Sequence, residues 1–160
     1  MLVGEQPGND EDLAGKPFVG PAGQLLDKAL AEAGIDRRDV FVTNAVKHFK
    51  FERRGKRRLH ERPNAHEIAR CNVWLEQERR LVAPDLVVAL GATAARSLLG
   101  KIVTISRLRG KPLELPGGGR AFITVHPSLL LRIPDARDRK AELRRFTGEL
   151  REAWRIASRQ

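Results

Sequence analysis

The fold is decided by one uninterrupted apolar stretch, Leu86-Val87-Val88-Ala89-Leu90. A run of this kind is typical of a strand that is covered on both faces, because a strand with one face in water alternates apolar and polar residues. Gly91 follows at once and leads into a short helix that ends near Gly100. The sequence therefore predicts a buried parallel strand at 86–90.

Strands and helices alternate on both sides of this stretch. Further strands are expected at 1–3, 40–43 and 121–125, which with 86–90 gives four. Helices are expected at 21–33, at about 65–82 and from about 136, where apolar residues recur at helical spacing. This alternation predicts an α/β fold: a three-layer α/β/α sandwich around a central, mostly parallel four-stranded sheet. At 160 residues the chain is expected to form one domain, spanning 1–160.

The charge balance points to a polyanionic partner. Thirty lysines and arginines against twenty aspartates and glutamates give a formal net charge of +10. Such a chain gains affinity for nucleic acid by releasing counterions, although an arginine-rich surface can also reflect a GC-rich genome. No apolar stretch approaches the roughly 18 residues of a membrane helix, and no signal peptide precedes the first strand. We therefore expect a cytoplasmic protein without membrane contact.

Polar residues follow three of the predicted strands, where sites lie in parallel sheets. Glu5 could act as a general base or stabilise cationic character. The alternative is that its segment forms only a tight turn. The carboxamide of Asn44 can pair in two directions, which suits the edge of a pyrimidine, although asparagine is also a common turn residue. His126 is a candidate donor to a developing oxyanion or an ordinary cap.

The segment 45–64 has no helical or strand period and mixes basic with aromatic residues. It ends in the basic run Lys56-Arg57-Arg58-Leu59-His60. Such interleaving is the footprint of a nucleic-acid contact, and a solvated charged loop is the alternative. Phe18 lies in a glycine-flanked loop. It is either a core residue or a platform on which a base stacks.

The chain resembles the iron–sulfur-type uracil-DNA glycosylases. The resemblance lies in seven segments that occur in the same order: 4–12, 15–26, 42–51, 55–60, 71–75, 90–95 and 126–128. The resemblance covers nearly the whole chain. Glu5-Gln6-Pro7, the run 46–51 and the basic loop that ends at His60 are similar to the X-type branch of that group. The basic loop is the specific signal, because it is an insertion that ordinary members lack.

The resemblance implies a deoxyuridine extruded from DNA and a role for each matching residue. Phe18 stacks on uracil, Asn44 binds its pyrimidine edge, and Gln6 and Asp12 shape the same pocket. His126 stabilises negative charge on the departing base. Glu5 supports the cationic sugar or assists the nucleophile. The residues expected to contact DNA are Lys56, Arg57, Arg58, Ser128 and Arg132.

In the X-type branch the loop histidine, here His60, attacks C1′ and leaves a covalent bond to the abasic sugar. The expected activity is therefore that of a DNA-repair glycosidase that acts on uracil-containing DNA, single strands included, and binds its product covalently. The protein is expected to be a monomer. Two alternatives remain open. The protein is an ordinary glycosylase that hydrolyses the bond and releases abasic DNA, or a non-catalytic remnant that binds DNA.

Two features depart from the family pattern. Asn9 stands where these enzymes usually have an acidic residue. Cys71 is the single cysteine and matches one cluster ligand, whereas Ala89 stands near where another is usual. The upstream pair is absent, and with it an N-terminal segment of the family. Because an all-cysteine iron–sulfur cluster needs four thiolates, we predict no cluster and a buried helical Cys71.

Overall fold

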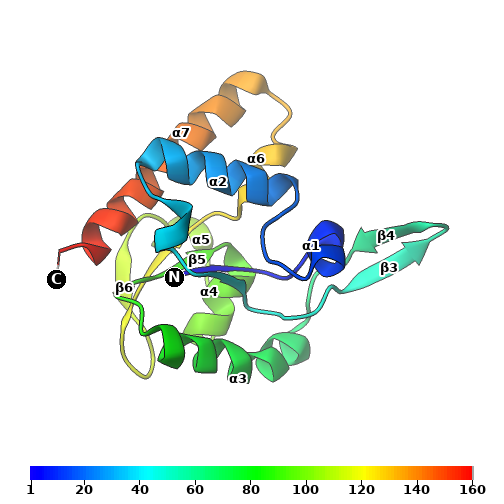
Figure 1. Ribbon diagram of the computed structural model, residues 1–160, viewed down its shortest axis with the longest axis horizontal. Helices are drawn as coiled ribbons and strands as arrows, with labels where there is room; N and C mark the ends of the chain where they lie inside the picture. The colour runs from blue at the N-terminus through cyan, green and yellow to red at the C-terminus, as the bar shows by residue number, and fades with distance from the viewer. Residues whose placement is uncertain (160) are drawn as a thin grey trace.

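The computed structural model describes residues 1–159. At its centre is a five-stranded sheet in the order β2-β1-β5-β7-β6 (Figure 1). The edge strand β6 (Pro112–Glu114) is antiparallel to its neighbour β7. The other four strands run parallel: β1 (Leu2–Gly4), β2 (Val42–Asn44), β5 (Val87–Leu90) and β7 (Arg120–Thr124). The predicted α/β class and the mostly parallel sheet are confirmed.

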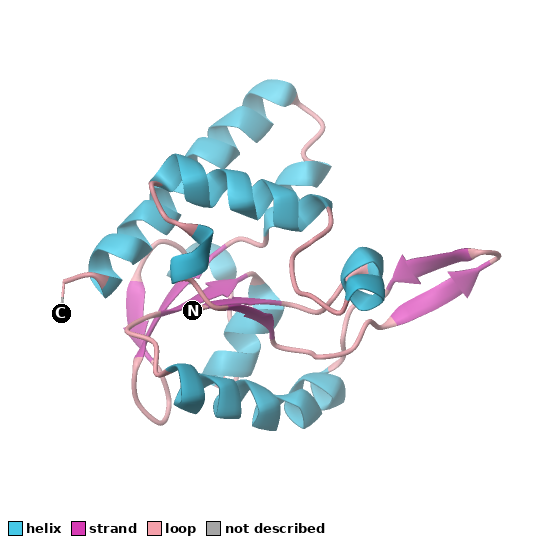
Figure 2. Cartoon of the chain, in the orientation of Figure 1, coloured by secondary structure: helices cyan, strands magenta, loops and turns pink. Residues whose placement is uncertain are grey.

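Helices cover both faces of this sheet (Figure 2). One face carries α2 (Pro21–Ala33), α6 (Pro127–Arg132) and α7 (Ala136–Ala157). The other face carries α3 (Ala65–Val82) and α4 (Ala92–Leu99), while α5 (Ile105–Leu108) contacts β7. A 3-10 turn, η1 (Arg37–Asp39), precedes β2. Within the described residues, no helix is long and apolar enough to cross a membrane.

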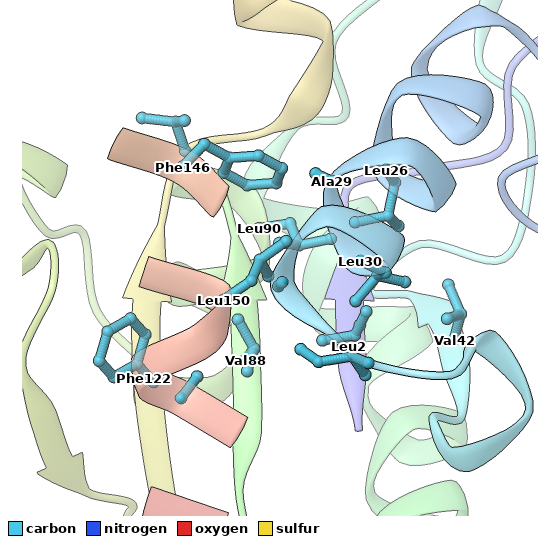
Figure 3. Packing of buried hydrophobic residues seen from close by; sticks show 14 of the residues in the cluster. Leu2, Leu26, Ala29, Leu30, Val42, Val88, Leu90, Phe122, Phe146 and Leu150 are labelled. Atoms are coloured by element: carbon cyan, nitrogen blue, oxygen red, sulfur yellow. The ribbon is translucent and has the colours of Figure 1, made fainter. Parts of the chain in front are cut away.

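Alternate residues of the strands point into two separate cores. Val88 and Phe122 pack against α2 and α7 (Figure 3). Val87 and Ile123 face the opposite side, toward α3 and α4. All four residues of β5 are buried, as the unbroken apolar run predicts for a central strand.

Capping residues fix the ends of the long helices. The side chain of Asn64 accepts a hydrogen bond from the backbone of Glu67, whose carboxylate accepts one from the backbone of Asn64, and this capping box starts α3. Pro21 stands in the first turn of α2, and Gly34 ends that helix with a φ of 78°. The predicted bounds 21–33 and 65–82 agree with α2 and α3.

The sheet has five strands rather than the expected four. The additional strand β6 has exposed or half-buried side chains and no apolar alternation, so periodicity does not mark it. Backbone pairing with β7 at the edge of the sheet holds it in place.

Two elements were not predicted from the sequence, a short helix and a hairpin. The helix α1 (Asn9–Ala14) buries no residue, so it lacks an apolar face. The strands β3 (Phe51–Arg54) and β4 (Arg57–His60) form an antiparallel hairpin that turns at Gly55, whose φ is 61°. We refer to residues 51–60 as the basic hairpin. It projects from the body of the molecule beside α1 (Figure 1).

A buried ion cluster ties the end of the chain to the sheet. The guanidinium of Arg109, 7% exposed, pairs with the carboxylates of Glu142 and Glu149. Glu149 also accepts a hydrogen bond of 2.5 Å from the hydroxyl of Thr124 on β7. The cluster therefore fixes α7 against the strand that leads to His126.

Candidate functional site

A cavity of about 710 Å³ lies at the carboxyl edge of the parallel strands. It is a place where α/β proteins bind ligands, and its size suits a small organic molecule. The lining comes from the segments after β1, β2, β5 and β7, from α1 and α6, and from the base of the hairpin. Polar and aromatic side chains converge there: Glu5, Gln6, Phe18, Asn44, His60, Arg62, Thr93, His126, Ser128 and Arg132.

One wall of the cavity is built for a planar ring. Phe18 is buried and has a φ of 53°, an uncommon conformation for a bulky residue. Gly23 fixes this turn, because a Cβ there would lie 1.9 Å from the carbonyl oxygen of Phe18. Gly4 lies between the ring of Phe18 and the amide of Asn44, and a Cβ on Gly4 would lie 2.5 Å from each. These close approaches require glycine.

The amide of Asn44 offers an unused acceptor. Its Oδ1 is buried and has no hydrogen-bond partner among the described residues. A buried polar atom without a partner costs roughly 1–3 kcal/mol, so this acceptor beside the cavity is available to a ligand. The backbone carbonyl of Asn44 is anchored by the ammonium of Lys47 at 2.7 Å.

His126 is held as a neutral donor. Its ring stacks on Phe18 with centroids 5.7 Å apart, and its Nδ1 accepts a hydrogen bond of 3.1 Å from the backbone N–H of Ser128. Burial lowers the pKa of His126 to about 4. A neutral imidazole that accepts at Nδ1 carries its proton on Nε2, so Nε2 is left to donate.

Glu5 is an ionised carboxylate at the mouth of the cavity. Its Oε1 lies 3.2 Å from Nε2 of His60, its Oε2 accepts a hydrogen bond from the hydroxyl of Thr93, and Arg62 lies 3.9 Å away. Burial opposes ionisation, but the hydrogen bonds from His60 and Thr93 outweigh it, so the pKa of Glu5 lies below its ordinary value of 4.5.

The side chain of Gln6 holds the base of the basic hairpin. Its amide nitrogen donates to the carbonyls of Lys50 (3.2 Å) and Glu61 (3.0 Å). Its amide oxygen accepts from the backbone N–H of Lys50 at 3.2 Å. Gln6 thus joins the segment that carries Glu5 to both ends of the segment that carries His60.

A carboxylate, two histidines, a stacking ring and an unpaired amide therefore meet at one pocket edge. Residues 1–151 match the uracil DNA glycosylase superfamily. The chain belongs to this superfamily.

The glycosylase is similar to several type-4 uracil-DNA glycosylases. The type-4 uracil-DNA glycosylase of Thermotoga maritima is 42% identical over 150 residues, which cover 93% of this chain and 72% of the relative. The corresponding protein of Archaeoglobus fulgidus is 34% identical over 157 residues, covering 94% and 75%. That of Pyrobaculum aerophilum is 38% identical over 144 residues, covering 86% and 70%.

Most of the site residues expected from the sequence lie together in this glycosylase. Three of them make contacts other than those expected. Gln6 lines the cavity, yet its amide is engaged by the hairpin backbone. Asp12 does not line the cavity and pairs instead with Arg58. Arg58 is turned inward by that pairing, whereas Lys56 and Arg57 are exposed at the hairpin turn.

Thr93, Leu131 and Arg62 are among the lining residues that the sequence did not identify. Thr93 stands in the first turn of α4 and reaches across to Glu5. Leu131 lines the cavity from α6 with 46% of its surface exposed. A threonine or leucine at a helix end carries no distinctive signal, and only the fold brings either one to the pocket.

The residues present do not fit a cluster held by four thiolates. The chain supplies one thiol, and Cys71 is buried beside Val46 and Ile68. Within residues 1–159, no three side chains of the metal-binding types come together. The expected absence of a cluster stays a prediction, and iron analysis of the purified protein tests it.

Proposed function

We propose that this glycosylase releases uracil from DNA and captures the abasic sugar through His60, as in the X-type branch. The contact of 3.2 Å between Nε2 of His60 and Oε1 of Glu5, at the mouth of the cavity, carries the proposal. It brings a nucleophile and the carboxylate that can take its proton to one place. In this proposal the protein acts as a single-domain monomer in the cytoplasm.

Uracil enters the cavity as a base rotated out of the DNA strand. The ring of Phe18 supports stacking, and the unpartnered Oδ1 of Asn44 supports a hydrogen bond from N3–H of uracil. Gly4 leaves no room for a side chain between these two groups. The pocket wall therefore favours a flat base with a donor at its edge.

Cleavage of the N-glycosidic bond leaves its electron pair on uracil and positive character at C1′. The Nε2–H of neutral His126 stabilises the negative charge on the base, and ionised Glu5 stabilises the sugar cation. Both groups are preorganised, His126 by Ser128 and Glu5 by Thr93.

Capture follows when a ring nitrogen of His60 bonds to C1′. The imidazole then loses its other ring proton to Glu5, so the adduct is a neutral N-glycosyl imidazole and uracil departs with the bonding electrons. One protein molecule is consumed for each uracil. Phosphates on either side are expected to meet Ser128 and Arg132 at the mouth and Lys56 and Arg57 at the hairpin turn, whereas Arg58 is engaged elsewhere.

A denaturing gel with a single-stranded oligonucleotide that contains one uracil tests the proposal. The wild type is expected to give a heat-stable shifted band, and His60→Ala is expected to lose this band while abasic DNA is still released. An adduct that survives in His60→Ala would rule out the assigned nucleophile. Abasic DNA without adduct from the wild type would favour ordinary hydrolysis. Salt-sensitive binding without uracil release, unchanged in Glu5→Gln, would favour a non-catalytic DNA-binding protein.

A further inference from the structure

The basic hairpin needs an attachment to the body of the protein. Its strands β3 and β4 pair only with each other in the described structure, and most of its side chains are exposed. A two-stranded hairpin without further packing is marginally stable in water. Gln6 fixes its base, but the turn lies several residues farther out. The position of His60, the last residue of β4, therefore depends on what else holds the strand.

Arg58 supplies this attachment. Its Nε donates to Oδ1 of Asn9 at 2.8 Å, and its Nη1 pairs with Oδ2 of Asp12 at 2.6 Å. The guanidinium also lies over two aromatic rings, 5.2 Å from the centroid of Phe49 and 5.1 Å from that of Phe51. Only 20% of this side chain is exposed, although its neighbours on the hairpin are exposed. We call these five residues the Arg58 clamp.

The clamp joins the two segments whose spacing matters for chemistry. Arg58 and His60 are two positions apart on β4, so their side chains leave the same face of the strand. Asn9 and Asp12 lie on α1, which begins four residues after Glu5. The clamp therefore pulls the face of the hairpin that carries His60 toward the segment that carries Glu5.

His60 has little packing of its own to keep it there. Its side chain is 51% exposed, whereas that of Glu5 is 19% exposed. Phe51 is the cross-strand partner of His60 and also one of the rings beneath Arg58. A displacement of the clamp is thus transmitted directly to the residue opposite His60.

We infer that Arg58 is a positioning residue that decides between capture of the sugar by His60 and attack by water. The inference rests on the proposed function. Water is abundant around a half-exposed site, so the imidazole competes only while it is held within bonding distance of C1′. A misplacement of about 1 Å can reduce the rate of such a step by about a hundredfold. Release of uracil depends on Glu5, His126 and Asn44, which lie outside the hairpin.

The clamp requires the planar guanidinium of arginine, and a positive charge alone would not replace it. The planar guanidinium presents two N–H groups to α1 while its face lies on the rings, and a lysine ammonium cannot do both. Asn9 is part of the clamp through its neutral oxygen, so the residue that departs from the family pattern has a defined partner here.

The experiment compares Arg58→Gln with Arg54→Gln. Each removes one positive charge from the hairpin. Arg54 lies outside the clamp: its side chain is exposed, and its Nη2 lies 3.5 Å from Oε2 of Glu52, which is also exposed. Uracil released and adduct formed are measured in the same single-turnover reaction on a single-stranded oligonucleotide. For Arg58→Gln we expect the adduct per uracil released to fall about tenfold, with abasic DNA in its place. Arg54→Gln is expected to keep the ratio of the wild type.

Two further variants separate positioning from general damage. Arg58→Lys is expected to restore part of the ratio, and Asp12→Asn to lower it in the same direction as Arg58→Gln. Thermal melting identifies any variant that does not fold. A ratio in Arg58→Gln equal to that of the wild type would overturn this inference alone. Parallel loss of uracil release and adduct in folded Arg58→Gln would also overturn it. A wild type that releases uracil without adduct would overturn the capture proposal as well.

Discussion

The hydroxyl of Thr93 donates a hydrogen bond to Oε2 of Glu5, joining the first turn of α4 to the loop after β1. Burial opposes ionisation of Glu5, and the contact with His60 and this bond from Thr93 lower its pKa below the ordinary value. The carboxylate is therefore oriented before substrate binds.

Replacement of Thr93 by valine keeps the shape of the side chain and removes the donor. A hydrogen bond to a charged group contributes roughly 1.5–3 kcal/mol, so we expect uracil release to slow by about tenfold or more. The single-turnover rate of base release checks this, with Thr93→Ser as the control that retains a hydroxyl. A wild-type rate in Thr93→Val would show that Glu5 does not depend on this bond.

The pH dependence of uracil release follows from the same groups. His126 has a pKa of about 4 and Glu5 a pKa below 4.5, so above these values the histidine is neutral and the glutamate is ionised. We expect release to stay level from neutral pH into the mildly acidic range and to decline as the pH falls through about 4, the pKa of His126. Base release measured across this range is the test. A decline centred near 6.5, the ordinary pKa of histidine, would contradict the assigned state of His126.

Gly4 should not tolerate a side chain. The Cβ of Gly4→Ala would lie 2.5 Å from both the Phe18 ring and Oδ1 of Asn44, and overpacking of this kind costs about 1–3 kcal/mol. We expect a lower melting temperature and strongly reduced uracil release. Gly148→Ala is the matched control, because Gly148 lies within α7 with open space around it. That change should stabilise the protein by about 1 kcal/mol.

The ion cluster beneath α7 gives a prediction about stability. Arg109→Met would leave the carboxylates of Glu142 and Glu149 without their buried cation, which destabilises by about 3–5 kcal/mol. Arg145→Met removes a 57% exposed partner of Glu149 and should cost less than about 1 kcal/mol. Denaturant unfolding of the two variants measures the difference. Equal losses of unfolding free energy in the two variants would show that burial of Arg109 adds nothing to the stability that its ion pairs provide.

The sequence is informative where burial dictates residue type. The apolar run at 86–90 predicts β5 because both faces of that strand are covered, and the helical spacing after Pro63 predicts α3. The positions of Glu5, Asn44 and His126 after strands also predict that they meet, since parallel strands end at one edge.

The sequence is silent where distant side chains decide the structure. The basic hairpin has no apolar alternation, and its order comes from Gln6 and from the clamp on α1, which no local pattern reveals. For the same reason Arg58 reads as a phosphate contact, although it is turned toward Asp12. Thr93 is found only when α4 is placed beside β1.

The basic hairpin is attached to the fold from outside, and its strands take no part in the central sheet. Neither hydrophobic core includes a residue of 51–60. On the proposed mechanism, gain or loss of this appendage would exchange a reusable catalyst for a reagent spent once, without any change to the interior of the fold. The proposed mechanism then predicts that the hairpin, grafted together with its anchors on α1, would give a related scaffold the ability to tag damaged DNA irreversibly.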